Sequence, residues 1–236
     1  TLRSSSAASD VYKRQPKRTA DQITWHGLEG SSPLLAVSEF RAAIENSTKV
    51  AESDLTVIVT AEPASTDQWA SGLRFFQSAA STINDIARFP DWETLPYDSF
   101  SPHQDITSER LACLQQLRNK PAGVLIVPAA TLVQKIAPTS FLDGACFDLK
   151  RGQLFRAEEQ RLRLEAAGYH ATDTVTERGQ YAVRGAVMDI FPMGAELPVR
   201  IDLFDDEIDT LRTFDPETQL SVEQINELII LPGKEF

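Results

Sequence analysis

The spacing of apolar residues changes along the chain, and the change divides it into two parts. In the first part, helical spacing predicts helices over residues 34–44, 67–76, 108–117 and 130–136. Short runs rich in β-branched residues predict buried strands at 55–61 and 123–128. Buried strands that alternate with helices are typical of a parallel α/β layer, which we expect from about Ser32 to Pro138.

The second part has a different pattern. A charged amphipathic helix is predicted over residues 156–167 and ends at Gly168. It is followed by pieces of strand length at 180–184, 186–191, 199–204 and 208–214, with a further strand expected at 226–231. The spacers between them are short and carry turn residues, which indicates antiparallel hairpins. The fold class predicted is therefore a parallel α/β domain followed by a small α+β domain with an antiparallel sheet.

Three segments follow from this change of pattern. Residues 1–18 are polar, Ser-rich and basic without the apolar core of a signal peptide, so we expect a disordered, non-native leader. Residues 19–146 form the predicted α/β domain, and residues 147–236 form the predicted α+β domain.

Charge narrows the range of partners. The first 18 residues hold five of the 23 basic and one of the 34 acidic residues, so the remainder has 18 basic and 33 acidic residues and a net charge of −15. This balance argues against a broad phosphate-binding surface. No apolar run is long enough to span a membrane. Cys113 and Cys146 lack metal or redox spacing, which favours free thiols and a reducing cytoplasm.

Catalytic motifs are incomplete. A phosphate-binding loop would be expected near Gly27 and Gly30, but Ser31 and Ser32 stand where its lysine and hydroxyl are needed. Residues 201–207 (IDLFDDE) imitate the acidic strand end of an ATPase, yet without that loop a solvated hairpin turn is favoured. The three histidines are scattered. We therefore predict no catalytic residue, no cofactor and no metal.

The segment from Tyr181 to Phe204 is the most informative. Arg184 and Arg200 are isolated cations in an acidic region. Arginine is enriched in the residues that dominate protein interfaces, so a partner site is one interpretation of these two residues. An ion pair with a nearby acid inside the domain is an equally weighted alternative.

Several longer motifs occur in order. They are WETLPYDSFSPHQD at 92–105, GVLIVP at 123–128, RGAVMDIFPMG at 184–194 and FDDEID at 204–209. The first pair resembles the transcription-repair coupling factor family (Mfd), and the second pair resembles both this family and the repair helicase UvrB. The resemblance covers about Ser32 to Phe236.

The resemblance implies the front module of such a factor: a degenerate UvrB-like helicase domain and then a domain that binds the excision-repair protein UvrA. By motif match, the UvrA-contact positions are Arg184, Arg200 and Phe204. In this family, the ATP-dependent DNA translocase and the RNA polymerase-binding domain lie downstream of the front module, so they are not expected within these 236 residues. The chain is thus expected to recruit UvrA to stalled RNA polymerase without being an enzyme.

Two alternatives stay open. One is a nucleotide-dependent DNA helicase-type domain of the UvrB kind. The other is a structural clamp that docks its UvrA-binding face on a downstream domain of the parent protein and keeps it inactive. The aromatic segment carries a separate prediction, which is burial of Trp92, Leu95, Tyr97 and Phe100 in packing around the α/β layer.

Overall fold

A computed structural model describes residues 22, 24–45, 55–76, 86–94, 102–119 and 123–235. Two compact units are present. The first comprises Thr1–Phe89 and Lys120–Leu132, and the second comprises Pro90–Asn119 and Val133–Phe236. The predicted leader lies outside the described residues, as do Leu95, Tyr97 and Phe100 of the aromatic segment.

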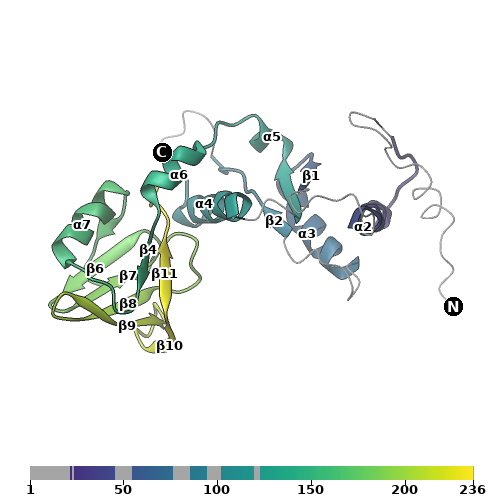
Figure 1. Cartoon of the computed structure of the whole chain (residues 1–236). Helices are drawn as coiled ribbons and strands as arrows, with labels where there is room; N and C mark the ends of the chain where they lie inside the picture. The colour runs from purple at the N-terminus through teal and green to yellow at the C-terminus, as the bar shows by residue number, and fades with distance from the viewer. Residues whose placement is uncertain are drawn as a thin grey trace. The chain divides into compact units, whose positions relative to one another are not determined.

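The first unit is built on a parallel sheet (Figure 1). Strand β3 lies between β1 and β2 and is parallel to both. The apolar core between sheet and helices contains Leu34, Ile58, Leu73 and Ile126. The elements of this unit are α2 (Ser32–Glu45), β1 (Leu55–Thr60), α3 (Ser65–Phe76), β2 (Ile86–Arg88), β3 (Gly123–Pro128) and α5 (Ala129–Leu132).

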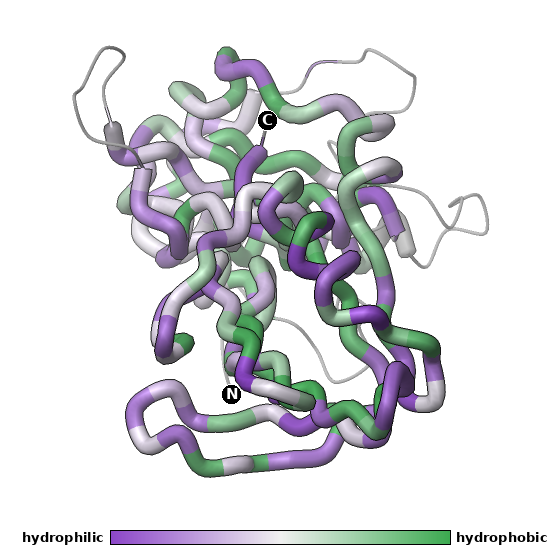
Figure 2. Tube along the Cα trace, turned by 90° about the vertical axis from the view of Figure 1, so that its left-hand side faces the viewer, coloured by the Kyte–Doolittle hydropathy of each residue, from purple (hydrophilic) through white to green (hydrophobic). Residues whose placement is uncertain are grey.

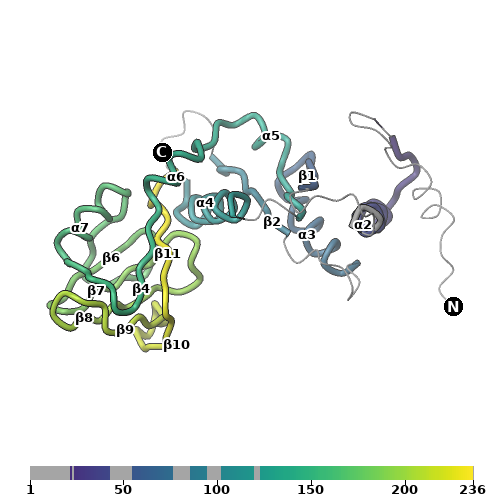
Figure 3. The backbone as a smooth tube through the Cα atoms, in the orientation of Figure 1, coloured from purple at the N-terminus to yellow at the C-terminus, as the bar shows by residue number. Residues whose placement is uncertain are grey.

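The second unit contains an antiparallel sheet with the order β10-β9-β8-β7-β6-β5, in which only the short β5 runs parallel to its neighbour. Its strands are β5 (His170–Ala171), β6 (Gln180–Arg184), β7 (Val187–Ile190), β8 (Val199–Phe204), β9 (Glu207–Phe214) and β10 (Ser221–Ile225). A second, two-stranded sheet pairs β4 (Phe147–Lys150) with β11 (Glu227–Ile230), which Figure 3 shows as the teal and yellow segments. The helices are α4 (Gln104–Asn119), α6 (Thr139–Ala145) and α7 (Ala157–Ala166).

The two faces of the six-stranded sheet differ in polarity. One face buries Tyr181, Met188, Ile201 and Leu211 in the main core of the unit. Successive residues of a strand point to opposite sides, so the residues between these lie on the other face. We call that other face the outer face; it carries the polar side chains Arg184, Asp189, Arg200, Asp202, Thr210 and Arg212. Figure 2 shows hydrophobic segments in green and hydrophilic segments in purple interspersed along the chain.

Helix α4 belongs to this second unit. Leu111 is fully buried in its core, and the Ser108 hydroxyl accepts a 2.7 Å hydrogen bond from the backbone N–H of Gly194. Arg110 is fully buried and binds the Glu235 carboxylate through two nitrogens, at 2.8 and 3.3 Å. The indole ring of Trp92 lies 3.9 Å from the same guanidinium. One buried cation therefore ties the last described residue to this helix.

The predicted fold class is confirmed, and several details differ. The predicted helix at 130–136 ends at Leu132, because Val133 and Ile136 are exposed and give no buried face to extend it. Trp92 is half-buried, less than predicted. Strands β4 and β10 were not predicted. The predicted division of the chain at residue 147 stays a prediction.

Candidate protein-binding face

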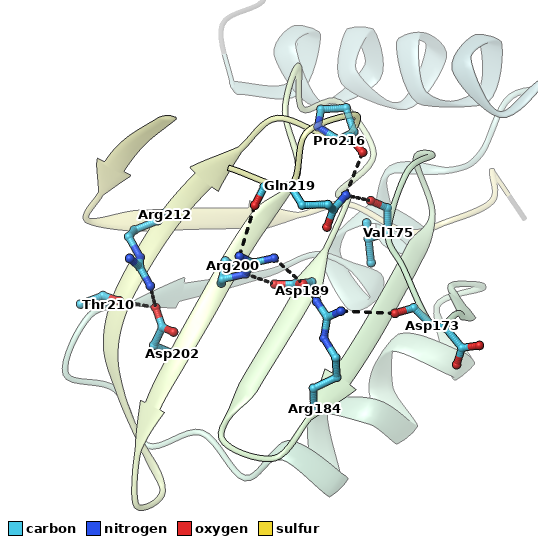
Figure 4. Close-up of polar contacts among 10 residues, drawn as sticks. All are labelled: Asp173, Val175, Arg184, Asp189, Arg200, Asp202, Thr210, Arg212, Pro216 and Gln219. Carbon is cyan, nitrogen blue, oxygen red and sulfur yellow. Dashed lines mark hydrogen bonds and ion pairs between the residues drawn. The ribbon is translucent and has the colours of Figure 1, made fainter. Parts of the chain in front are cut away.

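Strand register brings the two predicted arginines to one acid. Asp189 of β7 lies directly opposite Arg200 of β8, and Arg184 ends β6, the strand on the other side of β7. Figure 4 shows both guanidinium groups directed at the Asp189 carboxylate. That carboxylate is fully buried. Sequence reasoning did not single out Asp189, although an acid within the apolar strand VMDI was the available signal.

All three guanidinium nitrogens of Arg200 already have hydrogen-bond partners within the domain. Its Nε and Nη2 donate to the two Asp189 oxygens at 2.7 and 2.9 Å, and its Nη1 donates to the carbonyl of Gln219 at 3.5 Å. The guanidinium carbon also lies 4.8 Å from the centre of the buried Phe214 ring. The hydrogen bonds to Asp189 are the main cause that raises the pKa of Arg200. This residue thus has the contacts of a structural group.

Arg184 is held more loosely. It pairs with Asp189 through Nη2, and its Nη1 lies 3.4 Å from the carbonyl of Asp173. Its side chain is 48% exposed, whereas that of Arg200 is 21% exposed. Arg184 therefore has a hydrogen-bond partner at each terminal nitrogen, while about half of its side chain remains exposed to solvent. The equally weighted alternative, an ion pair inside the domain, describes Arg200 fully and Arg184 in part.

A third arginine lies on the outer face next to these two. Arg212 of β9 is directly opposite Arg200 and binds Asp202 through Nη2 at 2.6 Å. Thr210 donates to the same Asp202 oxygen at 2.6 Å. Burial works against ionisation of Asp202, but the hydrogen bonds from Thr210 and Arg212 outweigh it and lower its pKa. Sequence reasoning missed this set, because it depends on the pairing of β8 with β9.

Phe204 stands apart from the arginine network. It ends β8 at a tight hairpin, where Asp205 takes the left-handed conformation with φ of 53°. Leu203 packs on the core, so Phe204 faces outward, and it is 74% exposed. The hairpin tip and Arg184 lie at the same end of the strands, since the N–H of Leu203 donates to the carbonyl of Ala186, close to Arg184 in the chain. The structure thus brings the three predicted residues to one face while leaving Phe204 outside their hydrogen-bond network.

The acidic run IDLFDDE is part of this hairpin. Asp205, Asp206 and Glu207 are exposed in and beside its turn, as the hairpin interpretation predicted.

The glycine turn that was compared with a phosphate-binding loop lies near the start of the described residues. Gly27 and Gly30 have φ of 72° and 58°, and Ser32 begins α2. Across the described residues, no group of three metal-ligating side chains is found. No described helix is long and apolar enough to cross a membrane.

The sheet has one apolar face in the core and one face with partly exposed arginines and a protruding phenylalanine. Residues 147–236 match the family described as the UvrB interaction domain. The chain is 44% identical over 202 residues to the transcription-repair-coupling factor of Haemophilus influenzae, covering 86% of this chain and 16% of that protein.

Other relatives agree. Identity to the Escherichia coli transcription-repair-coupling factor is 52% over 151 residues, which is 64% of this chain and 13% of that protein. The Bacillus subtilis factor is 30% identical over 132 residues, covering 56% of this chain and 11% of that protein. The chain belongs to the transcription-repair-coupling factor family, of whose members it spans less than one fifth of the length.

Proposed function

We propose that this chain recruits UvrA for transcription-coupled nucleotide excision repair and has no catalysis of its own. The observation that carries the proposal is the match of residues 147–236 of this chain to the UvrB interaction domain. The relatives of the chain are named transcription-repair-coupling factors, which fits the same role. The outer face supports it, because it exposes an arginine and a phenylalanine on neighbouring parts of one sheet. Such residues are enriched among those that dominate binding energy.

The three predicted residues take different parts in this proposal. Arg184 and Phe204 contact UvrA, since both are substantially exposed. Arg200 acts as a positioning residue, because its donors are directed to Asp189 and Gln219. It fixes Asp189, which in turn holds Arg184 against the sheet.

Calorimetric titration of purified UvrA into the chain tests the proposal. We expect wild-type binding, and we expect Arg184→Ala and Phe204→Ala each to weaken it by ~2 kcal/mol, the range of interface hot spots. If Arg184 meets a carboxylate on UvrA, wild-type affinity falls as salt is raised and the Arg184→Ala affinity falls less. Normal affinity in both variants would reject this site.

The wider setting is part of the same proposal. RNA polymerase and DNA are engaged through downstream segments of the parent protein, which we expect to be an ATP-dependent translocase working in the cytoplasm. The same outer face can dock on a downstream domain and be masked there. ATP turnover by the isolated chain, measured with and without DNA, separates this proposal from a helicase-type function. Turnover lost in Ser31→Ala or Ser32→Ala would support the helicase.

A further inference from the structure

The outer face is closed at one end and open at the other. At the closed end, Val175, Ala182, Phe191 and Phe214 form a small buried cluster of their own. Gln219 helps to cover it, since its side-chain amide donates to the carbonyls of Val175 and Pro216 at 3.1 and 2.8 Å. A partner therefore has access at the opposite end, where the β8–β9 hairpin lies.

Three residues form a row across this open end. Phe204 pairs with Glu207 in the hairpin, and Glu207 forms an isolated antiparallel bridge with Leu154. Paired residues of neighbouring strands point to the same side, so all three share the outer face. Neighbouring strands are about 4.8 Å apart, which places the backbones of Phe204 and Leu154 about 10 Å from each other.

Leu154 is an unusual residue for this position. Leu154 is 62% exposed, while the next residue, Phe155, is buried in the core. Two backbone hydrogen bonds hold the segment. The N–H of Phe155 donates to the backbone carbonyl of Asp206 at 2.7 Å, and the N–H of Ile208 donates to the backbone carbonyl of Gln153 at 3.0 Å. Because the backbone of this leucine is already held, covering it costs only side-chain freedom.

Glu207 stands between the two apolar side chains. A side-chain carbon added at Gly152 would lie 3.7 Å from Oε1 of Glu207, so this carboxylate lies over the glycine. Both Phe204 and Leu154 remain substantially exposed beside it. The row therefore has an apolar group at each end.

We infer that Leu154 is a second apolar anchor of the UvrA-binding surface, paired with Phe204 across Glu207. The inference rests on the proposed function and assigns the chemistry of the partner: two apolar contacts on UvrA, one for each side chain, with a hydrogen-bond donor or cation between them for Glu207 and a carboxylate for Arg184. Its support is continuity, because Leu154 extends the exposed row that begins at Phe204. All of these residues lie within the matched range 147–236.

The test uses the full chain and purified Escherichia coli UvrA in calorimetric titrations. We expect Leu154→Ala to weaken binding about fivefold or more, the effect that separates contributing from neutral interface residues. Leu154→Asn keeps the length and branching of the side chain but makes its end polar, so it should weaken binding more than Leu154→Ala. Leu162→Ala is the matched control, since Leu162 is a leucine of the same unit, on α7, and is 56% exposed.

The outcomes separate the two proposals. Weaker binding by both Leu154 variants with normal binding by Leu162→Ala and unchanged melting curves supports the inference. Normal binding by both Leu154 variants, together with weak binding by Phe204→Ala, overturns the inference and leaves the proposed function standing. Equal losses in the Leu154 and Leu162 variants also overturn it. Absence of wild-type binding overturns the proposed function and the inference with it.

Discussion

Two arginines that look equivalent in the sequence differ at the scale of the residue. Arg200 donates to Asp189 from two nitrogens, in the fork geometry that makes arginine–carboxylate pairs strong. Arg184 reaches the same acid with one nitrogen and remains half exposed. Because Asp189 is fully buried, the loss of its main partner costs more than the loss of the secondary one.

Arg200→Ala should therefore destabilise the fold by roughly 3 kcal/mol, the lower end for a broken buried ion pair, since Arg184 still reaches Asp189. For Arg184→Ala we expect a loss of about 1 kcal/mol or less. Urea unfolding followed by circular dichroism measures both. Equal losses in the two variants would show that the arginines share Asp189 evenly, and the proposed division into positioning and contact residues would then be wrong.

A second residue-scale prediction concerns acid stability. The pKa of Asp202 is lowered from 3.8 in the folded chain, so its contribution is present above that value and is lost as pH falls through the folded pKa. Asp202→Asn should lose stability at pH 7 and show a shallower decline below about pH 4, where the wild type loses this contribution.

The measurement is the free energy of unfolding in urea at pH values between 7 and 2.5. Asp209→Asn serves as the control, because Asp209 is an exposed acid on the same strand β9. An acid decline as steep in Asp202→Asn as in the wild type would contradict the role given to Thr210 and Arg212.

At the scale of elements, the sequence predicted well wherever apolar periodicity was strong. The strands predicted at 180–184 and 199–204 are observed with the same bounds, and the strand predicted at 208–214 begins one residue earlier, at Glu207. Their order as hairpins followed from short spacers. Strand β10 was missed because SVEQI has no buried alternation: it is formed by pairing with β9, a tertiary effect.

The candidate site was predictable only in part, for a related reason. Motif resemblance pointed to Arg184, Arg200 and Phe204, and all three lie on one face. The more exposed of the two arginines could not be identified from the sequence, because it depends on the register of β7 with β8. The place of Leu154 in the row depends on a bridge between residues 53 positions apart. Periodicity along one strand carries no information on pairing between distant segments.

Helix α4 provides an element-scale prediction, because it carries two arginines in contrasting surroundings. Arg110 is fully buried with Glu235, whereas Arg118 pairs with Asp143 at the surface, where both side chains are at least 37% exposed. We expect Arg110→Ala to cost roughly 3–5 kcal/mol and Arg118→Ala less than about 1 kcal/mol. Chemical denaturation of the two variants measures the contrast, and a small effect in Arg110→Ala would contradict the anchoring role.

At the scale of the whole molecule, the compact unit is larger than the matched family range. The match begins at residue 147, but the unit also takes in Pro90–Asn119 and Val133–Cys146. Leu111, Leu142 and the buried contacts of Arg110 all lie before residue 147. The matched range therefore leaves out residues that pack in the core of this unit.

The last prediction follows from this difference. A fragment of residues 147–236 should be less stable than one of residues 90–236 by more than about 3 kcal/mol, because it loses Leu111 from the core and leaves Glu235 without Arg110. Glu235→Gln in both fragments identifies the cause: it should destabilise the longer fragment and have little effect on the shorter, whose Glu235 has already lost its partner. Urea unfolding of the four proteins gives the full cycle. If the two fragments unfold at the same urea concentration, helix α4 contributes nothing to the stability of the sheet, and the smaller range is a complete folding unit.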